Sequence, residues 1–519
     1  MSSRTRFSFY NILSGVFLQG ISFLLSFLIR AVFIKTLGEL YLGLDGLFSN
    51  LLSFLNLAEL GIGTAILIEL YRTTAENNAE KSRQYLHFYK KMYRITGMVI
   101  LAVGLCLFPF LDLLIKDGKA LLNLVDYRMI FLLYLGNSVF PYLFFPERIA
   151  VFQSNQQEYR LRIIACRFKI LEAILQITGL FLLRNIYLFL CIPLFLGCVS
   201  TILKGILANK LFPELTKKPE SRLSAEEISG VKKNVKAVAL YKISGCINSA
   251  AGSIILSSFS GILMTGLYSN YLLLTGAAWT LLQKIFNSFA SSLGNLHAEK
   301  GVKNEQKYLI FKTLSFLNFW GSTFIAVLLF SMFTPLIKLW IGEKFLLDRG
   351  TELLLILNFL TTGLQETVGT HRGACGLFLQ GKYRPVFSVG MNIAVSVFLV
   401  KLFPEHGIKG ILAGSILSNL SITFWYDAKI VCKHCFGKSH REFCRTFLFR
   451  LILAVFLCAG IRLTCTLWSG LPLLCQIIFS FAAASLLFHG FLFLFFFRTQ
   501  EFALIRKKIA ILKQEGLFL

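Results

Sequence analysis

Long apolar runs separated by short polar intervals recur along the whole chain. Each run has about 20 residues, which is the length a helix needs to cross a hydrocarbon core of about 30 Å. The pattern predicts fourteen membrane-spanning helices, at residues 9–30, 42–68, 92–115, 127–148, 163–183, 186–209, 237–259, 264–285, 309–333, 352–373, 384–402, 409–430, 447–467 and 472–497. The run at 384–402 is short, so twelve or thirteen crossings also fit the pattern. No interval has room for a sizeable water-soluble domain, which indicates an all-α polytopic membrane protein.

Composition and charge agree with this class. Hydrophobic residues make up 55% of the 519 residues, and the mean hydropathy of +0.67 does not fit a soluble globule. Most of the 53 Lys and Arg residues fall in alternate loops. Because such residues stay on the cytoplasmic side, they predict a multi-pass membrane protein with both termini inside. This asymmetry explains the net charge of +26 without a nucleic-acid partner.

A basic interval between the sixth and seventh spans divides the chain. It predicts an N-terminal lobe at 1–210, a cytoplasmic linker at 211–236, a C-terminal lobe at 237–431, and two further helices with a cytoplasmic tail at 432–519. The sequence GLFSN at 46–50 recurs as GLYSN at 266–270, as duplicated transporter halves would require. Within the linker, Ser224 and Glu227 form a capping-box pattern that predicts a short amphipathic helix on the membrane surface, or a solvated linker helix.

Two of the predicted spans carry a polar stripe. Asp45, Ser49, Asn56, Glu59 and Gly63 fall within an arc of about 80° at helical spacing. A second stripe, from Asn270 through Lys284 to Asn295, covers about 60°. Charged groups at mid-membrane are costly, so these stripes are expected to face a hydrated cavity between two six-helix lobes. Hydrogen bonding between packed helices is the structural alternative.

Ionisable residues inside the apolar runs are the candidate site residues. Arg30, Arg148, Lys242 and Arg372 are the expected contacts of an anionic group such as a lipid diphosphate. We expect Asn50 and Asn270 to line the same substrate site. Glu59 and Glu366 are candidates for coupling transport to H⁺ or Na⁺, because a carboxylate in a wet cavity can bind either. Structural pairing with basic neighbours is the alternative for each of them.

Other site chemistry finds little support in the sequence. Cys432, Cys435, His440 and Cys444 nearly match a zinc knuckle, but the last spacing is one residue short, so no metal site is expected. There is no phosphate-binding loop for an ATP-driven pump, and no cofactor is expected. The predicted external loops leave little room for the active site of a membrane glycosyltransferase, so the sequence does not favour an enzyme.

Several segments resemble Wzx-type polysaccharide flippases of the MATE-like MOP transporter superfamily. The strongest are FIKTLGELYLGLDGLFSN at 33–50 and LAELGIGTAI at 57–66. Further matches are FYKKMY at 88–93, YSNY at 268–271, YRP at 383–385, GIKGILAGS at 407–415 and WYD at 425–427. The similarity spans about residues 10–430. Asp45, where this branch is expected to have Asn, and the Ala after Asp427 depart from its pattern.

The resemblance implies two six-helix lobes that open alternately to either side of the bacterial cytoplasmic (inner) membrane. The implied substrate is an undecaprenyl-diphosphate-linked oligosaccharide, flipped to the outer leaflet for capsule or exopolysaccharide synthesis. Anionic membrane lipids, a polysaccharide polymerase and glycosyltransferases are the expected partners. Two alternatives stay open, a MATE-like cation-coupled exporter of small organic cations and a scaffold that recruits glycosyltransferases without transporting anything.

Overall fold

The computed structural model is helical over most of the residues that it describes. These are residues 3–55, 62–76, 78–115, 126–155, 157–287, 289, 293, 296–297, 303–377 and 380–506. No β-strand occurs within these ranges. Within these ranges, each of the fourteen predicted spans contains helix, which confirms the predicted all-α polytopic class. Eight of the described helices are long and apolar enough to cross a membrane, or nine if the bent pair α7 and α8 counts as one span.

Large apolar side chains cover much of the outer surface. Leu182, Phe456 and Leu486 are 76%, 71% and 74% exposed, and many other Leu, Phe and Ile side chains resemble them. Apolar patches of this extent are not stable against water. Together with the apolar helices, they identify a multi-pass membrane protein.

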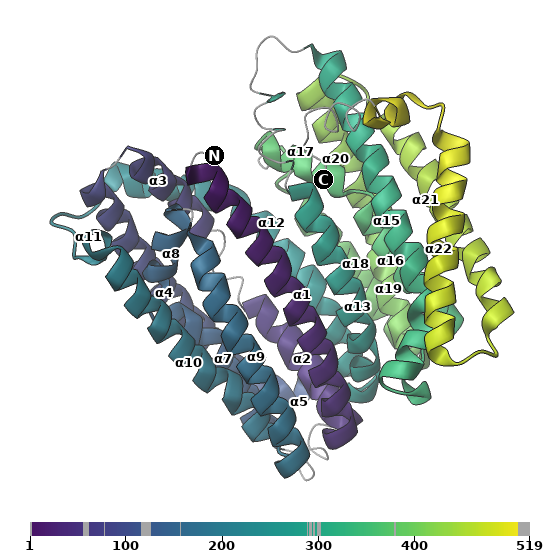
Figure 1. The fold of residues 1–519 in the computed structure, drawn as a ribbon, viewed down its shortest axis with the longest axis horizontal. Helices are drawn as coiled ribbons and strands as arrows, with labels where there is room; N and C mark the ends of the chain where they lie inside the picture. The colour runs from purple at the N-terminus through teal and green to yellow at the C-terminus, as the bar shows by residue number, and fades with distance from the viewer. Residues whose placement is uncertain are drawn as a thin grey trace. The chain divides into compact units, whose positions relative to one another are not determined.

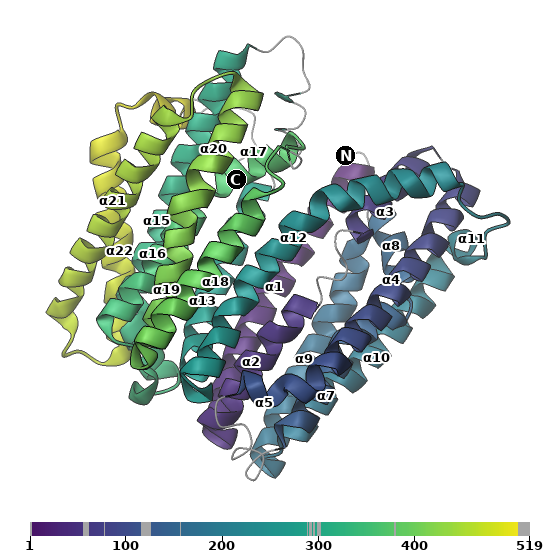
Figure 2. The ribbon, with the colours of Figure 1, turned by 180° about the vertical axis from the view of Figure 1, so that it is seen from behind.

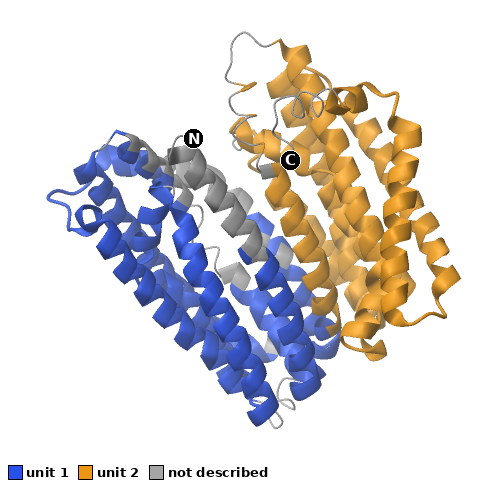
Figure 3. Cartoon of the chain, in the orientation of Figure 1, with its two compact units in different colours: residues 1–266 blue, residues 267–519 orange. Residues whose placement is uncertain are grey.

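The chain forms two compact units, residues 1–266 and 267–519 (Figure 3). The longer helices of unit 1 are α1 (Ser3–Leu37), α2 (Glu39–Leu55), α3 (Ile62–Ala75), α4 (Ala79–Leu107), α7 (Tyr127–Leu143), α8 (Pro146–Ser154), α9 (Glu158–Leu183), α10 (Ile186–Leu211) and α12 (Ala225–Phe259). Short helical turns occur at η2 (Phe108–Phe110), α5 (Leu111–Leu114) and α11 (Pro213–Thr216). Helix α13 (Ile262–Asn287) begins in unit 1 and continues into unit 2.

Successive neighbours pack along unit 1. Helix α1 packs on α9, α9 on α10, α10 on α7, and α7 on α4, while α12 packs on α2 and α3. Figures 1 and 2 show α4, α7, α9 and α10 running side by side. Polar side chains also join these helices, since Asn137 of α7 donates to the Leu190 carbonyl of α10 at 3.0 Å. This arrangement brings α4, α8 and the segment around α11 together at one end of the unit.

Unit 2 is built around the 37-residue helix α15 (Asn304–Trp340). Its other helices are α16 (Arg349–Gly363), α17 (Glu366–Ala374), α18 (Arg384–Leu402), α19 (Gly407–Ser418), α20 (Phe424–Val431), α21 (Arg441–Thr464) and α22 (Leu473–Phe496). Two π-helical segments, Asn419–Thr423 and Cys432–Phe436, flank α20. Helix α15 packs against α16, α21 and α22, while α18 packs on α19. The span predicted at 384–402 is therefore a helix with the predicted bounds.

Two predicted spans are broken where the sequence changes the backbone. In 127–148, Phe145 adopts a left-handed conformation and Pro146 starts α8, which bends 54° away from α7. In 352–373, α16 ends at Gly363 and α17 begins at Glu366. The span at 42–68 contains α2 and α3, and residues 56–61 between them lie outside the described residues.

The predicted linker is partly continuous with the next helix. The capping box at Ser224 and Glu227 is present, with both reciprocal bonds formed. Helix α12 then runs unbroken from Ala225 to Phe259, so the expected short separate helix is instead the first part of a long one. No proline interrupts this segment. The lobe boundaries at 1–210, 211–236, 237–431 and 432–519 stay a prediction.

Candidate functional site

A basic pocket lies where α4, α8 and the segment around α11 meet in unit 1. Its cavity has a volume of about 610 Å³. Seven cationic side chains line it, with Glu147 as the acidic member: Arg83, Lys90, Lys91, Arg94, Arg148, Lys217 and Lys218. Leu86 and Val151 form part of its apolar wall and belong to a buried cluster with Ile66 and Tyr89. The pocket thus combines a rigid apolar base with a concentration of positive charge.

Helical spacing gathers most of this charge. Residues 83, 87, 90, 91 and 94 recur at intervals of three and four along α4 and therefore share one face. Asn78 starts the helix by accepting a hydrogen bond from the Lys81 backbone at 2.9 Å. Arg148 comes from the first turn of α8, which the bend after α7 directs to the same end of the unit. Of the seven cations, only Arg148 was a predicted substrate contact, although the spacing on α4 was a readable signal.

Glu147 forms ion pairs with two of the pocket's cations. It is only 7% exposed, and its Oε1 atom lies 3.0 Å from Lys90 Nζ and 3.6 Å from Arg148 Nε. Its Oε2 atom is buried and accepts no hydrogen bond among the described residues. A buried carboxylate of this kind holds two cations in place. Arg83 and Lys217 pair with Glu80 at 2.8 Å and Glu214 at 2.7 Å, so the pocket keeps a smaller excess of positive charge than its lining alone suggests.

Polar contacts hold the segment after α10 against α4. Glu80 accepts a backbone hydrogen bond from Glu220 at 2.8 Å, and Gln84 donates to Ser221 Oγ at 2.6 Å. Lys81 Nζ lies 2.5 Å from Glu227 Oε1 at the start of α12. These contacts place Lys217 and Lys218 at the rim of the pocket.

Arg30 lies in a second polar cluster of unit 1, among α1, α2 and α7. Its Nη1 atom is 2.5 Å from Asp45 Oδ2, and Tyr134 of α7 donates to Asp45 Oδ1. The side chains of Arg30 and Asp45 are 12% and 21% exposed. Arg30, predicted to bind phosphate, is therefore held by a carboxylate in this conformation.

Arg372 forms the corresponding cluster of unit 2, among α17, α18 and α20. Asp427 accepts a hydrogen bond from Arg372 and binds Arg384 through both oxygens, at 2.9 Å and 3.1 Å. All three side chains are largely buried. Arg384 and Asp427 belong to the YRP and WYD segments, which this fold brings together. Two buried cations therefore share this carboxylate.

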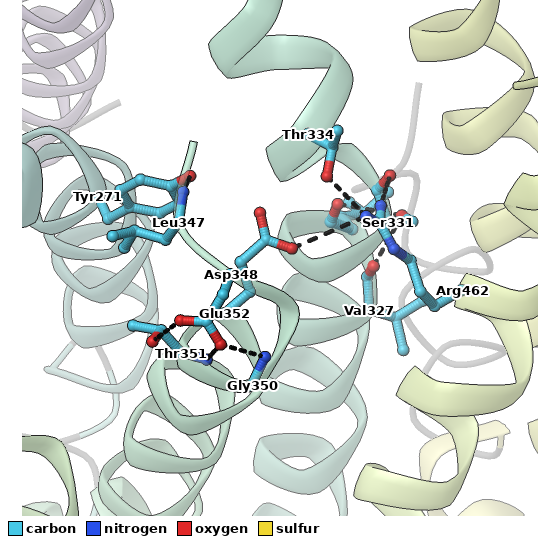
Figure 4. A network of polar contacts seen from close by, with 11 residues as sticks. Tyr271, Val327, Ser331, Thr334, Leu347, Asp348, Gly350, Thr351, Glu352 and Arg462 are labelled. Atoms are coloured by element: carbon cyan, nitrogen blue, oxygen red, sulfur yellow. Dashed lines mark hydrogen bonds and ion pairs between the residues drawn. The ribbon is translucent and has the colours of Figure 1, made fainter. Parts of the chain in front are cut away.

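Unit 2 contains another buried carboxylate that the sequence did not single out. Glu352 of α16 is 1% exposed, and Arg462 of α21 approaches its Oε2 atom to 3.7 Å (Figure 4). Arg462 also donates to Thr334 Oγ1 at 2.6 Å and to the Ser331 carbonyl at 3.0 Å. This network joins the C-terminal helix pair to α15 and α16. Only the packed structure relates residues so far apart in the chain.

The remaining predicted site residues are distributed over the fold. Asn50 donates to the Gly46 carbonyl at 2.7 Å and to Ser253 Oγ at 2.9 Å, linking α2 to α12. Asn270 is fully buried in α13, and Glu366 is half-buried at the first turn of α17. Glu59 and the side chain of Lys242 lie outside the described residues. Each predicted role stays a prediction.

The chain matches solved transporter structures in fold. A structure of the lipid II flippase MurJ, in an inward closed conformation, has a TM-score of 0.61 at 13% identity and covers 94% of this chain and 100% of its own. An inward-facing multidrug resistance MATE family transporter of the MOP superfamily has a TM-score of 0.59 at 13% identity, covering 83% and 94%. A Vibrio cholerae MATE transporter variant has a TM-score of 0.57 at 14% identity, covering 85% and 99%.

These matches define the architecture. No family model matches the chain, and the search of curated proteins gives no match. At such low identities the likeness shows the fold alone, which is that of the MATE and MurJ structures. The part of this chain that the MurJ alignment leaves out has fewer residues than helices α21 and α22 have together. At least part of this C-terminal helix pair therefore lies within that alignment.

Proposed function

We propose that this chain is a flippase for undecaprenyl-diphosphate-linked oligosaccharide, serving surface polysaccharide synthesis in the bacterial cytoplasmic membrane. The observation that carries the proposal is the basic pocket of unit 1, where seven Lys and Arg side chains surround one buried carboxylate. Arg and Lys donate charge-assisted hydrogen bonds to phosphate oxygens. The pocket therefore suits a diphosphate headgroup that enters from the cytoplasmic leaflet.

The buried ion pairs offer a way to transfer the substrate. In the proposed cycle, Arg30 and Arg372 are held by Asp45 and Asp427 until the diphosphate competes for them. The two lobes would open alternately, with the glycan in a hydrated cavity and the lipid tail in the bilayer. Glu59 and Glu366 are the proposed carboxylates for coupling to H⁺ or Na⁺. The proposed partners are anionic lipids, a polysaccharide polymerase and glycosyltransferases.

A MATE-like exporter of organic cations is the second candidate, and the shared fold supports it equally. Such an exporter would need a cavity dominated by acidic and aromatic side chains. The basic lining of the pocket in unit 1 instead favours an anionic substrate. A non-transporting scaffold would bind glycosyltransferases without moving lipid.

Reconstitution in liposomes with a defined undecaprenyl-diphosphate glycan tests the proposal. Leaflet exchange is scored with and without an imposed ion gradient, and phosphatidylglycerol serves as a competing anionic lipid. The double variant Lys91→Ala with Arg94→Ala should slow exchange at least about tenfold, since it removes two charge-assisted contacts of about 1.5–3 kcal/mol each. Arg445→Ala, an exposed cation on α21, is the matched control and should exchange at the wild-type rate.

The outcomes separate the candidate functions. Absence of glycan exchange by the folded wild-type protein in every gradient would contradict the flippase proposal. Exchange that is equal in the double variant and the control would reject the pocket as the headgroup site. Export of organic cations without glycan movement would instead support the exporter.

A further inference from the structure

Three side chains with metal-binding chemistry meet in unit 2, away from the basic pocket. His297 comes from the connection between α13 and α15, Cys375 follows α17, and Cys435 lies in the π-helical segment after α20. One ligand atom from each residue lies within 4.8 Å of the others. We propose that His297, Cys375 and Cys435 bind a zinc ion. This inference goes beyond the proposed flippase function and does not depend on it.

The spacing of the ligand atoms suits a shared ion better than a covalent bond. The two sulfurs are 3.1 Å apart, whereas a disulfide requires about 2.05 Å. Zinc–sulfur and zinc–nitrogen bonds of about 2.3 Å and 2.1 Å place tetrahedral ligand atoms about 3.5–3.8 Å from one another. Small side-chain rotations would bring the three atoms to these distances. The observed spacings, 3.1 Å between the sulfurs and at most 4.8 Å within the group, bracket these values.

The surroundings supply further features of a metal site. His297 Nε2 is buried and has no hydrogen-bond partner among the described residues. Lys307 donates to the His297 carbonyl at 3.2 Å, which fixes the backbone of this ligand. Two thiolates balance the charge of Zn²⁺, so a loaded site adds no net charge beside Lys307. Phe436 packs against the His297 ring at a centroid distance of 5.7 Å and shields the cluster.

His371 lies beside the cluster, but its ring nitrogens are not among the three ligand atoms that lie within 4.8 Å of one another, so it would have to move closer to serve as a fourth ligand. It is fully buried, and its ring centroid lies 5.9 Å from that of His297. Its Nδ1 atom lies 2.9 Å from the Thr367 carbonyl, a contact of the kind that commonly orients a zinc-binding imidazole. Its Nε2 atom is buried and has no hydrogen-bond partner within the described part of the chain. Two Cys and two His form a common structural zinc set.

The proposed site differs from the zinc knuckle considered in the sequence. Of the spaced Cys and His residues at 432–444, only Cys435 belongs to the cluster. Its partners come from two connections earlier in the chain, which no local motif could have revealed. A zinc ion here would fasten three helix ends to one another, in addition to the Arg372–Asp427 ion pair that already joins α17 to α20.

Zinc would also position the Arg372–Asp427 pair. Cys375 lies one helical turn after Arg372, and Cys435 follows the helix that carries Asp427. Because α17 and α20 pack against each other, an ion bridging their ends restricts movement of this buried pair. The ion is therefore expected to act as a structural clamp with an indirect effect on transport.

Metal content of the full-length protein tests the site. Protein purified in detergent under reducing conditions, equilibrated with Zn²⁺ and desalted, should retain about one zinc per chain by elemental mass spectrometry. Cys375→Ser and Cys435→Ser should each lower the zinc content at least about tenfold, because they remove a direct ligand. Cys166→Ser, which removes a thiol from α9 in unit 1, is the matched control and should keep its zinc.

A second measurement applies even where a cysteine variant fails to fold. A strong chelator should lower the thermal unfolding temperature of the wild-type protein, and added Zn²⁺ should restore it. Co²⁺ loading of the wild type should give a thiolate-to-metal charge-transfer band. Zinc retention equal in the two variants and the control would overturn the proposal. So would a wild type that retains no zinc, or a Cys375–Cys435 disulfide in the reduced preparation.

Discussion

Replacing Asp427 by Asn should lower the free energy of unfolding by about 3–5 kcal/mol, the cost of removing one partner from a buried ion pair. The change keeps the size of the side chain but removes the charge that Arg372 and Arg384 share. These arginine side chains are only 14% and 12% exposed, so water screens their mutual repulsion poorly. Titration of the solubilised protein with a denaturing detergent measures the loss.

An exposed ion pair provides the matched control. Glu214 and Lys217 are 2.7 Å apart, but their side chains are 65% and 58% exposed. Glu214→Gln is therefore expected to leave the free energy of unfolding unchanged, because solvent screens such a pair. Adding Arg384→Gln to Asp427→Asn should recover part of the loss, since it removes one of the two buried cations. If Asp427→Asn costs no more than Glu214→Gln, the cluster does not behave as a buried ion pair.

Two further predictions concern packing and pH. Gly414→Ala should cost about 1–3 kcal/mol of stability, because the added methyl would lie 2.9 Å from the Ser396 backbone nitrogen. The control Gly390→Ala on α18 places its methyl in open space and should not destabilise the fold. Equal unfolding temperatures of the two variants would refute this prediction. Glu227 precedes the predicted span, and hydrogen bonding from Lys81 lowers the pKa of its carboxyl group. The pair therefore stabilises the fold at pH values above the ordinary carboxyl pKa of 4.5. It loses this effect as the pH falls through the lowered pKa. The stability difference between the wild type and Glu227→Gln should thus be constant from pH 6 to 7 and shrink on acidification, and a pH-independent difference would contradict the assignment.

Part of the candidate site was accessible from the sequence because a charge inside an apolar run is conspicuous. Arg30, Arg148 and Arg372 were recognised in this way, and the structure places all three in polar clusters or in the basic pocket. Their partners were not recognised. Asp427 lies 55 residues after Arg372, and hydropathy carries no information on such pairing.

The basic face of α4 shows a different limitation. Its cations recur at helical spacing, so their common face was predictable. They were instead interpreted as part of the Lys and Arg excess that marks cytoplasmic loops. Only the packing of α8 and the segment around α11 turns this face into a pocket. A charged helix face becomes a binding site when neighbouring elements enclose it.

The sequence by itself determined that this chain is helical and crosses a membrane. The reason is local: in lipid every backbone polar group must be satisfied internally, so each long apolar run is committed to a helix wherever it lies in the fold. Tertiary structure decided which cations share a carboxylate, which gather in one pocket, and which thiols meet an imidazole. Those distances depend on how side chains of distant helices pack, and the helical period of any single segment does not contain them.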